Sequence, residues 1–361
     1  PASCRQVFIP FGVPEPGHGA FLAMLTDYDL PPALEADLVA LGQCLLAGIA
    51  PPPALVAACV ARLDGLPAAQ VVTASVRAGQ ALCCFCYPVT DPGKDRHRIC
   101  GVLAGMPMLA QVLIVHRDGY VREAALNALA TVPRSPFMLA VLAMRLNDWA
   151  APVREAATRC AGRLFLQVAP DVAVTMGLAL RGSWQDWTRW APAQAACMDL
   201  LCARPAVRVE LVARFATVCD APLGVTLRYF LRTPLLDAAL PMLAAMARQA
   251  SVRATALQVL LWGQARWKTG TRQEWVDKSL GLARPAPELA RRNVTLSVDR
   301  KVLIATALHD RAAMVRRTAL RALAQCRRDF PDLATMLPAL EADPSPTVRR
   351  WAGYLQQQAR P

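Results

Sequence analysis

A repeated pair of segments near the end of the chain constrains the fold more than any other feature of the sequence. Asp310 is followed by Val315-Arg316-Arg317, and 33 residues later Asp343 is followed by Val348-Arg349-Arg350. In both copies the Asp lies six residues before the first Arg. A fixed period with fixed internal spacing indicates an internal repeat. Each copy is therefore expected to contain a first helix, a turn that carries the Asp, and a second helix.

Earlier copies of the Val-Arg pair extend this pattern through the chain. They occur at Val121-Arg122, Val153-Arg154 and Val252-Arg253, with intervals of 32 residues and then 99 residues, which is three times 33. Asp148 lies six residues before Arg154, whereas the copies at Arg77 and Arg253 lack an Asp at that position. The intervals predict units of about 33 residues over most of the chain, two of them degenerate between residues 155 and 250.

The charged residues of the repeat are expected to hold it together. An Arg in the first turn of a helix lies at the positive end of the helix dipole, so it requires a carboxylate nearby, and an Asp in the preceding turn can also cap the helix. We expect each Arg to be partly buried against the Asp of its own repeat or of a neighbouring one. The residues concerned are Asp148, Arg154, Asp310, Arg316, Asp343 and Arg349.

These residues give the chain a resemblance to the HEAT-repeat family, whose units carry an Asp before the second helix and an Arg at its start. The resemblance implies an all-α, right-handed superhelical solenoid of about eight or nine antiparallel helix pairs. It would span residues 21–361, after an extended N-terminal arm at residues 1–20 that is rich in proline and glycine. An irregular loop at 87–96 and an insertion at 263–301 interrupt the predicted period.

Composition narrows the classes of partner. The net charge of +13 favours anionic partners, although an Arg-rich, Ala-rich composition is also typical of GC-rich genomes. The cysteines lie mostly within helical patterns, as in a cytoplasmic protein without disulfides. The long apolar stretches at 38–61 and 99–115 are interrupted by proline or glycine, so no membrane span is predicted.

One group of residues has the spacing of a metal site. Cys83 and Cys86 are two residues apart, as are His97 and Cys100, and a turn-rich segment joins the pairs. Tetrahedral zinc binds two such pairs of thiolate and imidazole ligands. The alternative interpretation is that Cys83 and Cys86 are packing residues and that His97 lies in a loop, and the adjacent Cys84 favours this alternative.

Aromatic and basic residues cluster in two places. Trp184, Trp187 and Trp190 recur every three residues, and we expect them to pack between repeats. The insertion at 263–301 interleaves aromatic with basic residues, which suits a nucleic acid or an acidic protein surface. The insertion residues that we single out as partner-binding are Trp267, Lys268, Arg272 and Trp275.

The second helices are expected to line a concave basic groove at the C-terminal end. The solvent-facing position after the structural Arg changes from Glu123 and Glu155 to Arg317 and Arg350 along the chain. With Arg321 and Arg328, these arginines would form one basic wall, while the alternative is a solvated helix face that binds nothing.

No motif for catalysis is recognisable. The sequence has no Gly-rich phosphate loop, G-x-S-x-G or H-E-x-x-H motif, and its four histidines are scattered. We therefore expect a cytoplasmic, non-enzymatic scaffold that binds a macromolecular partner along its concave face, with a protein of a larger bacterial-type assembly as the favoured partner. The alternatives are a nucleic-acid-binding solenoid that uses the C-terminal arginines and, less favoured, a HEAT-like DNA glycosylase.

Overall fold

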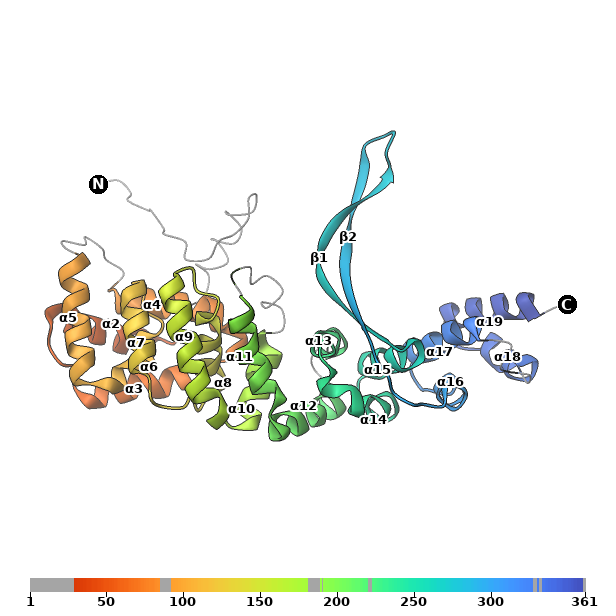
Figure 1. The fold of residues 1–361 in the computed structure, drawn as a ribbon, viewed down its shortest axis with the longest axis horizontal. Coiled ribbons are helices and arrows are strands. Elements are labelled where there is room, and N and C mark those ends of the chain that lie inside the picture. Colours follow the sequence, from red (N-terminus) through yellow and green to blue (C-terminus); the bar gives the residue numbers. More distant parts are fainter. Residues whose placement is uncertain are drawn as a thin grey trace. The chain divides into compact units, whose positions relative to one another are not determined.

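A computed structural model describes residues 29–84, 92–180, 189, 191–219, 223–326, 330 and 333–359. The chain divides into two compact units, residues 1–207 and 208–361. Most of the described residues are helical, and a single two-stranded sheet projects from the second unit (Figure 1). The predicted arm at residues 1–20 and the predicted tryptophan cluster at 184–190 lie outside the described residues.

The α-helices of the first unit are short and follow one another closely. They are α2 (Pro32–Ala47), α3 (Pro53–Asp64), α4 (Val71–Leu82), α5 (Pro92–Gly105), α6 (Ala110–Leu113), α7 (Gly119–Ala128), α8 (Pro136–Arg145), α9 (Ala151–Leu164), α10 (Pro170–Ala179) and α11 (Pro192–Ala203). Single 3₁₀ turns lie at η1 (Ala68–Gln70), η2 (Pro107–Leu109) and η3 (Phe165–Gln167). Helix α12 (Pro205–Thr217) contains the division between the two units.

In the second unit, helices precede and follow the two strands in the sequence. They are α13 (Leu223–Phe230), η6 (Pro234–Ala239), α14 (Leu240–Met246), α15 (Ala250–Trp262), α16 (Arg300–Leu308), α17 (Ala313–Gln325), α18 (Leu333–Glu341) and α19 (Pro346–Ala359). The strands β1 (Gln264–Asp277) and β2 (Leu282–Asn293) lie between α15 and α16.

Proline and short polar side chains set many of the helix starts. Helices α2, α3, α8, α10 and α11 each begin with proline, whose fixed φ suits the first helical position and whose missing N–H would have no partner there. The side chains of Asp118, Ser135 and Asp299 accept hydrogen bonds from backbone N–H groups in the first turns of α7, α8 and α16. Pro92 likewise begins α5, so residues 92–96 of the loop predicted at 87–96 are helical, and residues 87–91 are not described.

Helix α8 lies at the centre of the first unit. Every residue from Phe137 to Arg145 is buried, and the helix contacts α3, α4, α9 and α10. Helices α2 and α4 approach so closely that a Cβ added to Gly42 would lie 2.1 Å from the carbonyl oxygen of Leu82. Only glycine fits at that contact.

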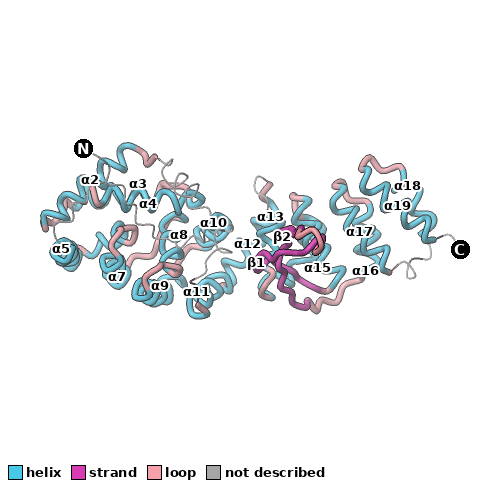
Figure 2. The backbone as a smooth tube through the Cα atoms, turned by 90° about the horizontal axis from the view of Figure 1, so that it is seen from above, coloured by secondary structure: helices cyan, strands magenta, loops and turns pink. Residues whose placement is uncertain are grey.

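Successive second helices are in contact in the second unit. Helix α15 contacts α13 and α17, and α17 contacts α19, while α14, α16 and α18 each contact the helix that follows them. One apolar core runs through α15, α16, α17, α18 and α19, with Leu257, Leu320 and Leu355 among its buried members. Figure 2 shows the strands in magenta beside α13 and α15, which both contact β1.

The prediction of an all-α fold is correct for most of the chain but wrong for the insertion at 263–301, where β1 and β2 form an antiparallel ribbon. The physical reason lies in the sequence of the insertion. Gly270 disfavours a helix, and Pro285 and Pro287 exclude a regular one between them because neither has an N–H to donate. Trp267, Trp275 and Val276 favour extended backbone.

In five copies of the Val-Arg pair, the arginine side chain makes the same contact with the backbone. One guanidinium nitrogen of Arg122, Arg154, Arg253 and Arg349 donates to the carbonyls six and five residues earlier, and that of Arg316 donates to the carbonyl of Asp310, six residues earlier. The oxygen six residues back is a backbone atom, so an Asp is not required there for this bond. This explains why the copy at Arg253 can have Ala247 at that position.

Three of these arginines also reach forward to an Asp in a later copy. Both carboxylate oxygens accept from the guanidinium in the pairs Arg122–Asp148, Arg253–Asp310 and Arg316–Asp343, at 2.7 to 2.9 Å. One oxygen of each Asp also accepts from the backbone N–H two residues later. Each Asp thus binds the backbone of the residue just before its own helix and the side chain of an arginine in an earlier copy. Arg154 is half-buried, whereas Arg349 is exposed despite its two backbone bonds.

Within the described residues, no single helix has both the length and the apolar composition needed to cross a membrane. One pair of helical segments, 53–64 with 68–82, meets those two criteria jointly, but it is bent by 96°.

Candidate interaction surface on the β-ribbon

The ribbon formed by β1 and β2 is the main departure from the helical pattern, and two of its features define a candidate site. Its strands pair from Gln264 opposite Asn293 to Asp277 opposite Leu282, with irregularities at Thr269 and Val276. It extends away from the helices of its unit (Figure 1). A ladder of this length presents two distinct faces and a tip.

The base of the ribbon is held by a charged side chain. Arg292 donates to the backbone carbonyls of Leu231 and Thr233 and forms an ion pair with both carboxylate oxygens of Asp237. Ala265, which lies opposite Arg292 in the ladder, is fully buried. Four hydrogen bonds and a buried contact therefore fix the ribbon to the segment between α13 and α14.

The turn at the far end is ordered by Asp277. One of its carboxylate oxygens accepts from the hydroxyl of Ser279 and from the backbone N–H groups of Ser279 and Leu280. These bonds, led by that of the Ser279 hydroxyl, lower the pKa of Asp277. Gly281 has a φ of +66°, a left-handed conformation that favours glycine and lets β2 begin.

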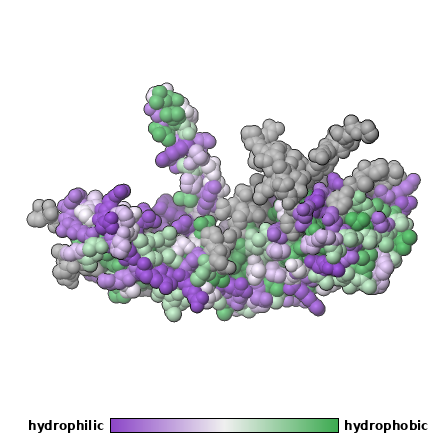
Figure 3. Space-filling view, turned by 180° about the vertical axis from the view of Figure 1, so that it is seen from behind, coloured by the Kyte–Doolittle hydropathy of each residue, from purple (hydrophilic) through white to green (hydrophobic). Residues whose placement is uncertain are grey.

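The tip of the ribbon is apolar and exposed. The exposed fractions are 56% for Trp275, 63% for Val276, 70% for Leu280 and 54% for Leu282. Figure 3 shows this green tip at the end of a stem with many hydrophilic residues. Exposed leucines are common singly, but four large apolar side chains within eight residues of a projecting element indicate a contact surface.

The ladder separates the charges of the ribbon onto two faces, because residues that are directly opposite share a face. We define the cationic face as the side of the ribbon that carries Gln264, Arg266, Lys268, Thr271, Gln273, Trp275, Ala283, Pro285, Pro287, Leu289, Arg291 and Asn293. All of these residues except Gln264 are exposed, and none is acidic.

All three carboxylates of the strands lie on the opposite, carboxylate face, which carries Ala265, Trp267, Gly270, Arg272, Glu274, Asp277, Leu282, Arg284, Ala286, Glu288, Ala290 and Arg292. Here Glu274 and Arg284 form an exposed ion pair at 2.8 Å. The residues predicted as one set therefore divide: Lys268 and Trp275 lie on the cationic face, and Trp267 and Arg272 lie on the carboxylate face.

The predicted basic wall is only partly described. Arg317 and Arg321 lie one helical turn apart on α17, and Arg350 lies on α19. All three are exposed, and none forms a hydrogen bond or ion pair with another described residue. Arg328 lies outside the described residues.

A charged cluster is buried in the first unit, where Arg122 and Arg145 share Asp148. Asp148 accepts three side-chain hydrogen bonds from the two guanidinium groups. Burial by itself would raise the pKa of Asp148, but the positive charges of Arg145 and Arg122 more than offset this, so the pKa is lowered. Burial lowers the pKa of Arg145 to about 10. The charges of the three side chains offset one another, although Nε of Arg145 is buried without a hydrogen-bond partner among the described residues.

The residues with zinc-like spacing are not brought together in the part of the chain that the structure describes. The sulfur of Cys83 lies 3.6 Å from Nε2 of His116, whereas His97 and Cys100 lie on α5, and Cys86 is not described. No three potential ligands from Cys, His, Asp and Glu converge among the described residues. Burial lowers the pKa of His116 to about 4, so its ring is neutral at physiological pH.

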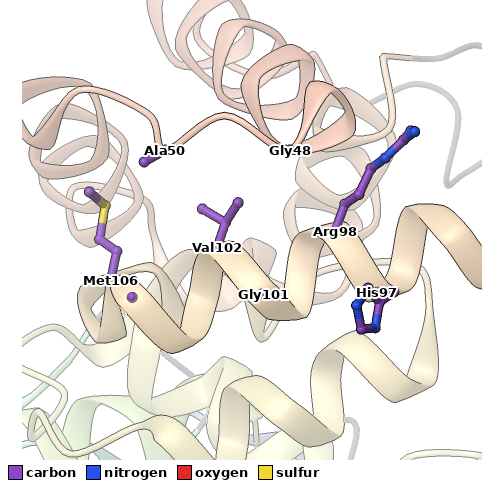
Figure 4. A pocket seen from close by; sticks show the side chains of 8 residues that line it. Gly48, Ala50, His97, Arg98, Gly101, Val102 and Met106 are labelled. Atoms are coloured by element: carbon purple, nitrogen blue, oxygen red, sulfur yellow. The ribbon is translucent and has the colours of Figure 1, made fainter.

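A shallow pocket lies beside α5 in the first unit (Figure 4). His97, Arg98 and Val102 line it from α5, Met106 from the residue that follows α5, and Gly48 and Ala50 from the segment that follows α2. Its polar side chains are one imidazole and one guanidinium, which does not amount to a catalytic constellation.

Comparisons of the chain with known protein families, with curated proteins and with solved structures give no match in any of the three.

The sequence indicated the insertion and its aromatic and basic residues, but it did not indicate the separation of charges between two faces. Alternation along the segment 264–268 was the available signal, since Arg266 and Lys268 are spaced two apart. The two ladder irregularities change which residues share a face, and these depend on the pairing of the strands.

Proposed function

We propose that the protein is a non-enzymatic scaffold of the HEAT-repeat type, built as a right-handed helical solenoid, that binds a protein partner through the tip of its β-ribbon. The anchored ribbon with its exposed apolar tip is the observation that carries the proposal. Hot spots of protein interfaces are apolar and aromatic side chains that become desolvated at the centre of the contact. Trp275, Leu280 and Leu282 have that character and occupy a fixed projection.

The repeated arginine contacts support the scaffold part of the proposal. The same pair of carbonyl acceptors recurs around Arg122, Arg154, Arg253 and Arg349, and a forward Arg–Asp pair links copies in both units. In repeat proteins, stability comes from each unit and its contacts with its neighbours. Such an architecture provides extended surface without a catalytic pocket.

The test is recovery of the partner with the full chain as bait. An affinity-tagged chain carrying Leu280→Ser and Leu282→Ser should lose the proteins that the unmodified chain retains. The matched control is Leu166→Ser with Leu200→Ser, because both of those leucines are equally exposed but lie in helical segments of the first unit. Equal recovery with the tip variant and the unmodified chain would refute the tip as the anchor.

Binding of nucleic acid by the C-terminal arginines is a second candidate function. The exposure of Arg317, Arg321 and Arg350, none of which has a carboxylate partner among the described residues, favours it. Salt dependence separates the two candidates, since contacts with phosphates make log affinity fall linearly with log salt concentration. Contacts at an apolar tip have no such slope.

A further inference from the structure

The cationic face of the ribbon contains a repulsive pair that nothing in its fold requires. Arg266 and Arg291 are directly opposite in the ladder, and Lys268 lies two residues beyond Arg266 on the same face. Like charges directly opposite one another destabilise a sheet. None of the three forms an ion pair with another described residue, and the face has no carboxylate, although three carboxylates occupy the other face.

The separation of charges therefore indicates an anionic ligand on this face, at the rows near the base of the ribbon that carry Arg266, Lys268 and Arg291. Arginine binds phosphate through two parallel hydrogen bonds, which suits Arg266 and Arg291. The other polar residues on this face are Gln264, Thr271, Gln273 and Asn293, whose side chains carry neutral donors and acceptors. Amide and hydroxyl groups of this kind also read base edges.

The dimensions favour duplex DNA over a membrane. Lys268 lies ten residues before Lys278 at the tip, which is roughly 33 Å of strand. Charges that far from an inserted tip would lie beyond the screening length of about 10 Å, so they could not help the tip to bind lipid headgroups. A ligand that lies along the ribbon can contact them. The major groove of B-form DNA admits a two-stranded β-ribbon, whereas that of A-form RNA is too narrow.

We propose that the cationic face of the ribbon binds duplex DNA, with Arg266, Lys268 and Arg291 on backbone phosphates and the neutral polar side chains of the same face toward the major groove. The proposed phosphate contacts include neither Leu280 and Leu282 of the tip nor Arg317, Arg321 and Arg350, so the proposal does not depend on the function inferred above.

The experiment adds the full chain to a fluorescently labelled DNA duplex of about 20 base pairs, roughly two helical turns. Fluorescence anisotropy gives the affinity at each of several salt concentrations. Arg266→Gln with Arg291→Gln should weaken binding at least tenfold. It should also reduce the slope of log affinity against log salt by about 2, one for each lost phosphate contact. The matched control, Arg272→Gln with Arg284→Gln, removes the same charge from the carboxylate face and should change affinity less than twofold.

Several results would overturn the proposal: absence of DNA binding by the unmodified chain, equal weakening by the two double variants, or equal affinity for an RNA duplex of the same sequence. Displacement of the DNA by an equal charge concentration of poly-glutamate would point instead to an acidic protein and would also overturn it. Leu280→Ser with Leu282→Ser should leave DNA binding unchanged while abolishing recovery of the protein partner, so the two proposals can fail independently.

Discussion

Removal of the Asp148 side chain should destabilise the first unit more than removal of any single exposed charge. Asp148 accepts hydrogen bonds from Nε and one Nη of Arg122, from one Nη of Arg145 and from the backbone of Ala150, at 2.8 to 3.1 Å. The side chains of Arg122 and Asp148 are 2% and 1% exposed. Asp148→Ala would leave two buried guanidinium groups without a counter-charge.

The expected loss is about 3 to 5 kcal/mol, the usual effect of removing one partner from a buried ion pair. Urea unfolding followed by far-UV circular dichroism measures it. With a slope near 2 kcal/mol per molar urea, the midpoint of the transition of the first unit should fall by about 2 M. Asp343→Ala is the comparison, and because its partner Arg316 is single and partly exposed, the loss should be about 1 to 3 kcal/mol.

A triple variant separates loss of charge balance from loss of packing. Asp148→Ala combined with Arg122→Met and Arg145→Met removes all three charges and should recover much of the lost stability, because an apolar replacement of a buried ion cluster is often nearly neutral. A loss below 1 kcal/mol in the single variant, or a triple variant less stable than the single one, would refute this account of the cluster.

Acid should remove the same contribution. The pKa of Asp148 is lower in the folded state than in the unfolded state, so its stabilisation is complete above the unfolded value of about 3.9. It is lost as the pH falls through the lower, folded pKa.

Three further predictions follow from residues described above. Because the pKa of His116 is about 4 in the folded chain, the unfolded chain binds more protons between pH 6.5 and 4, and lowering the pH over that interval should reduce stability by at most about 3 kcal/mol. His116→Asn should therefore make the urea midpoint depend less on pH, and an unchanged pH dependence of the midpoint would contradict this role of His116. Gly42→Ala should lower the melting temperature because its Cβ would meet the Leu82 carbonyl, whereas Gly101→Ala, where the added Cβ has open space, should not. Charge reversal of Arg317 and Arg321 should leave the melting temperature nearly unchanged, since exposed charges contribute little to folding stability. The same variant should weaken partner binding at least tenfold, and unaltered binding would refute the prediction of a basic wall.

The sequence allowed the helical part of the fold to be predicted because its signals are local. The Asp and the Val-Arg pair of the last two copies are only a few residues apart in the sequence, and α17 and α19 begin between them, where a second helix was expected. The Arg–Asp contacts were predicted less completely. Sequence spacing identified Asp343 as six residues before Arg349, but the carboxylate binds Arg316, 27 residues earlier.

The candidate site depended on information that the sequence carries only weakly. Whether Lys268 and Arg272 share a face is decided by the extra residue at Thr269, and a shift of one residue in pairing moves a side chain to the other face. The buried contact of Cys83 with His116 was also missed, although the 33 residues between them equal the repeat period, because the spacing of a zinc site grouped Cys83 with Cys86, His97 and Cys100 instead.

The prolines of β2 determine how the ribbon can associate with other strands. Pro285 and Pro287 are two apart, and the ladder runs past both, so their backbone nitrogens point away from β1. The free edge of β2 therefore lacks two successive donors, and a third strand cannot pair continuously there. Any sheet extension, whether by another copy of the chain or by an aggregating segment, is restricted to the opposite edge, beside Thr271 and Gln273. The ribbon is thus protected on one side against the open-ended stacking that an exposed hairpin of this length would otherwise permit.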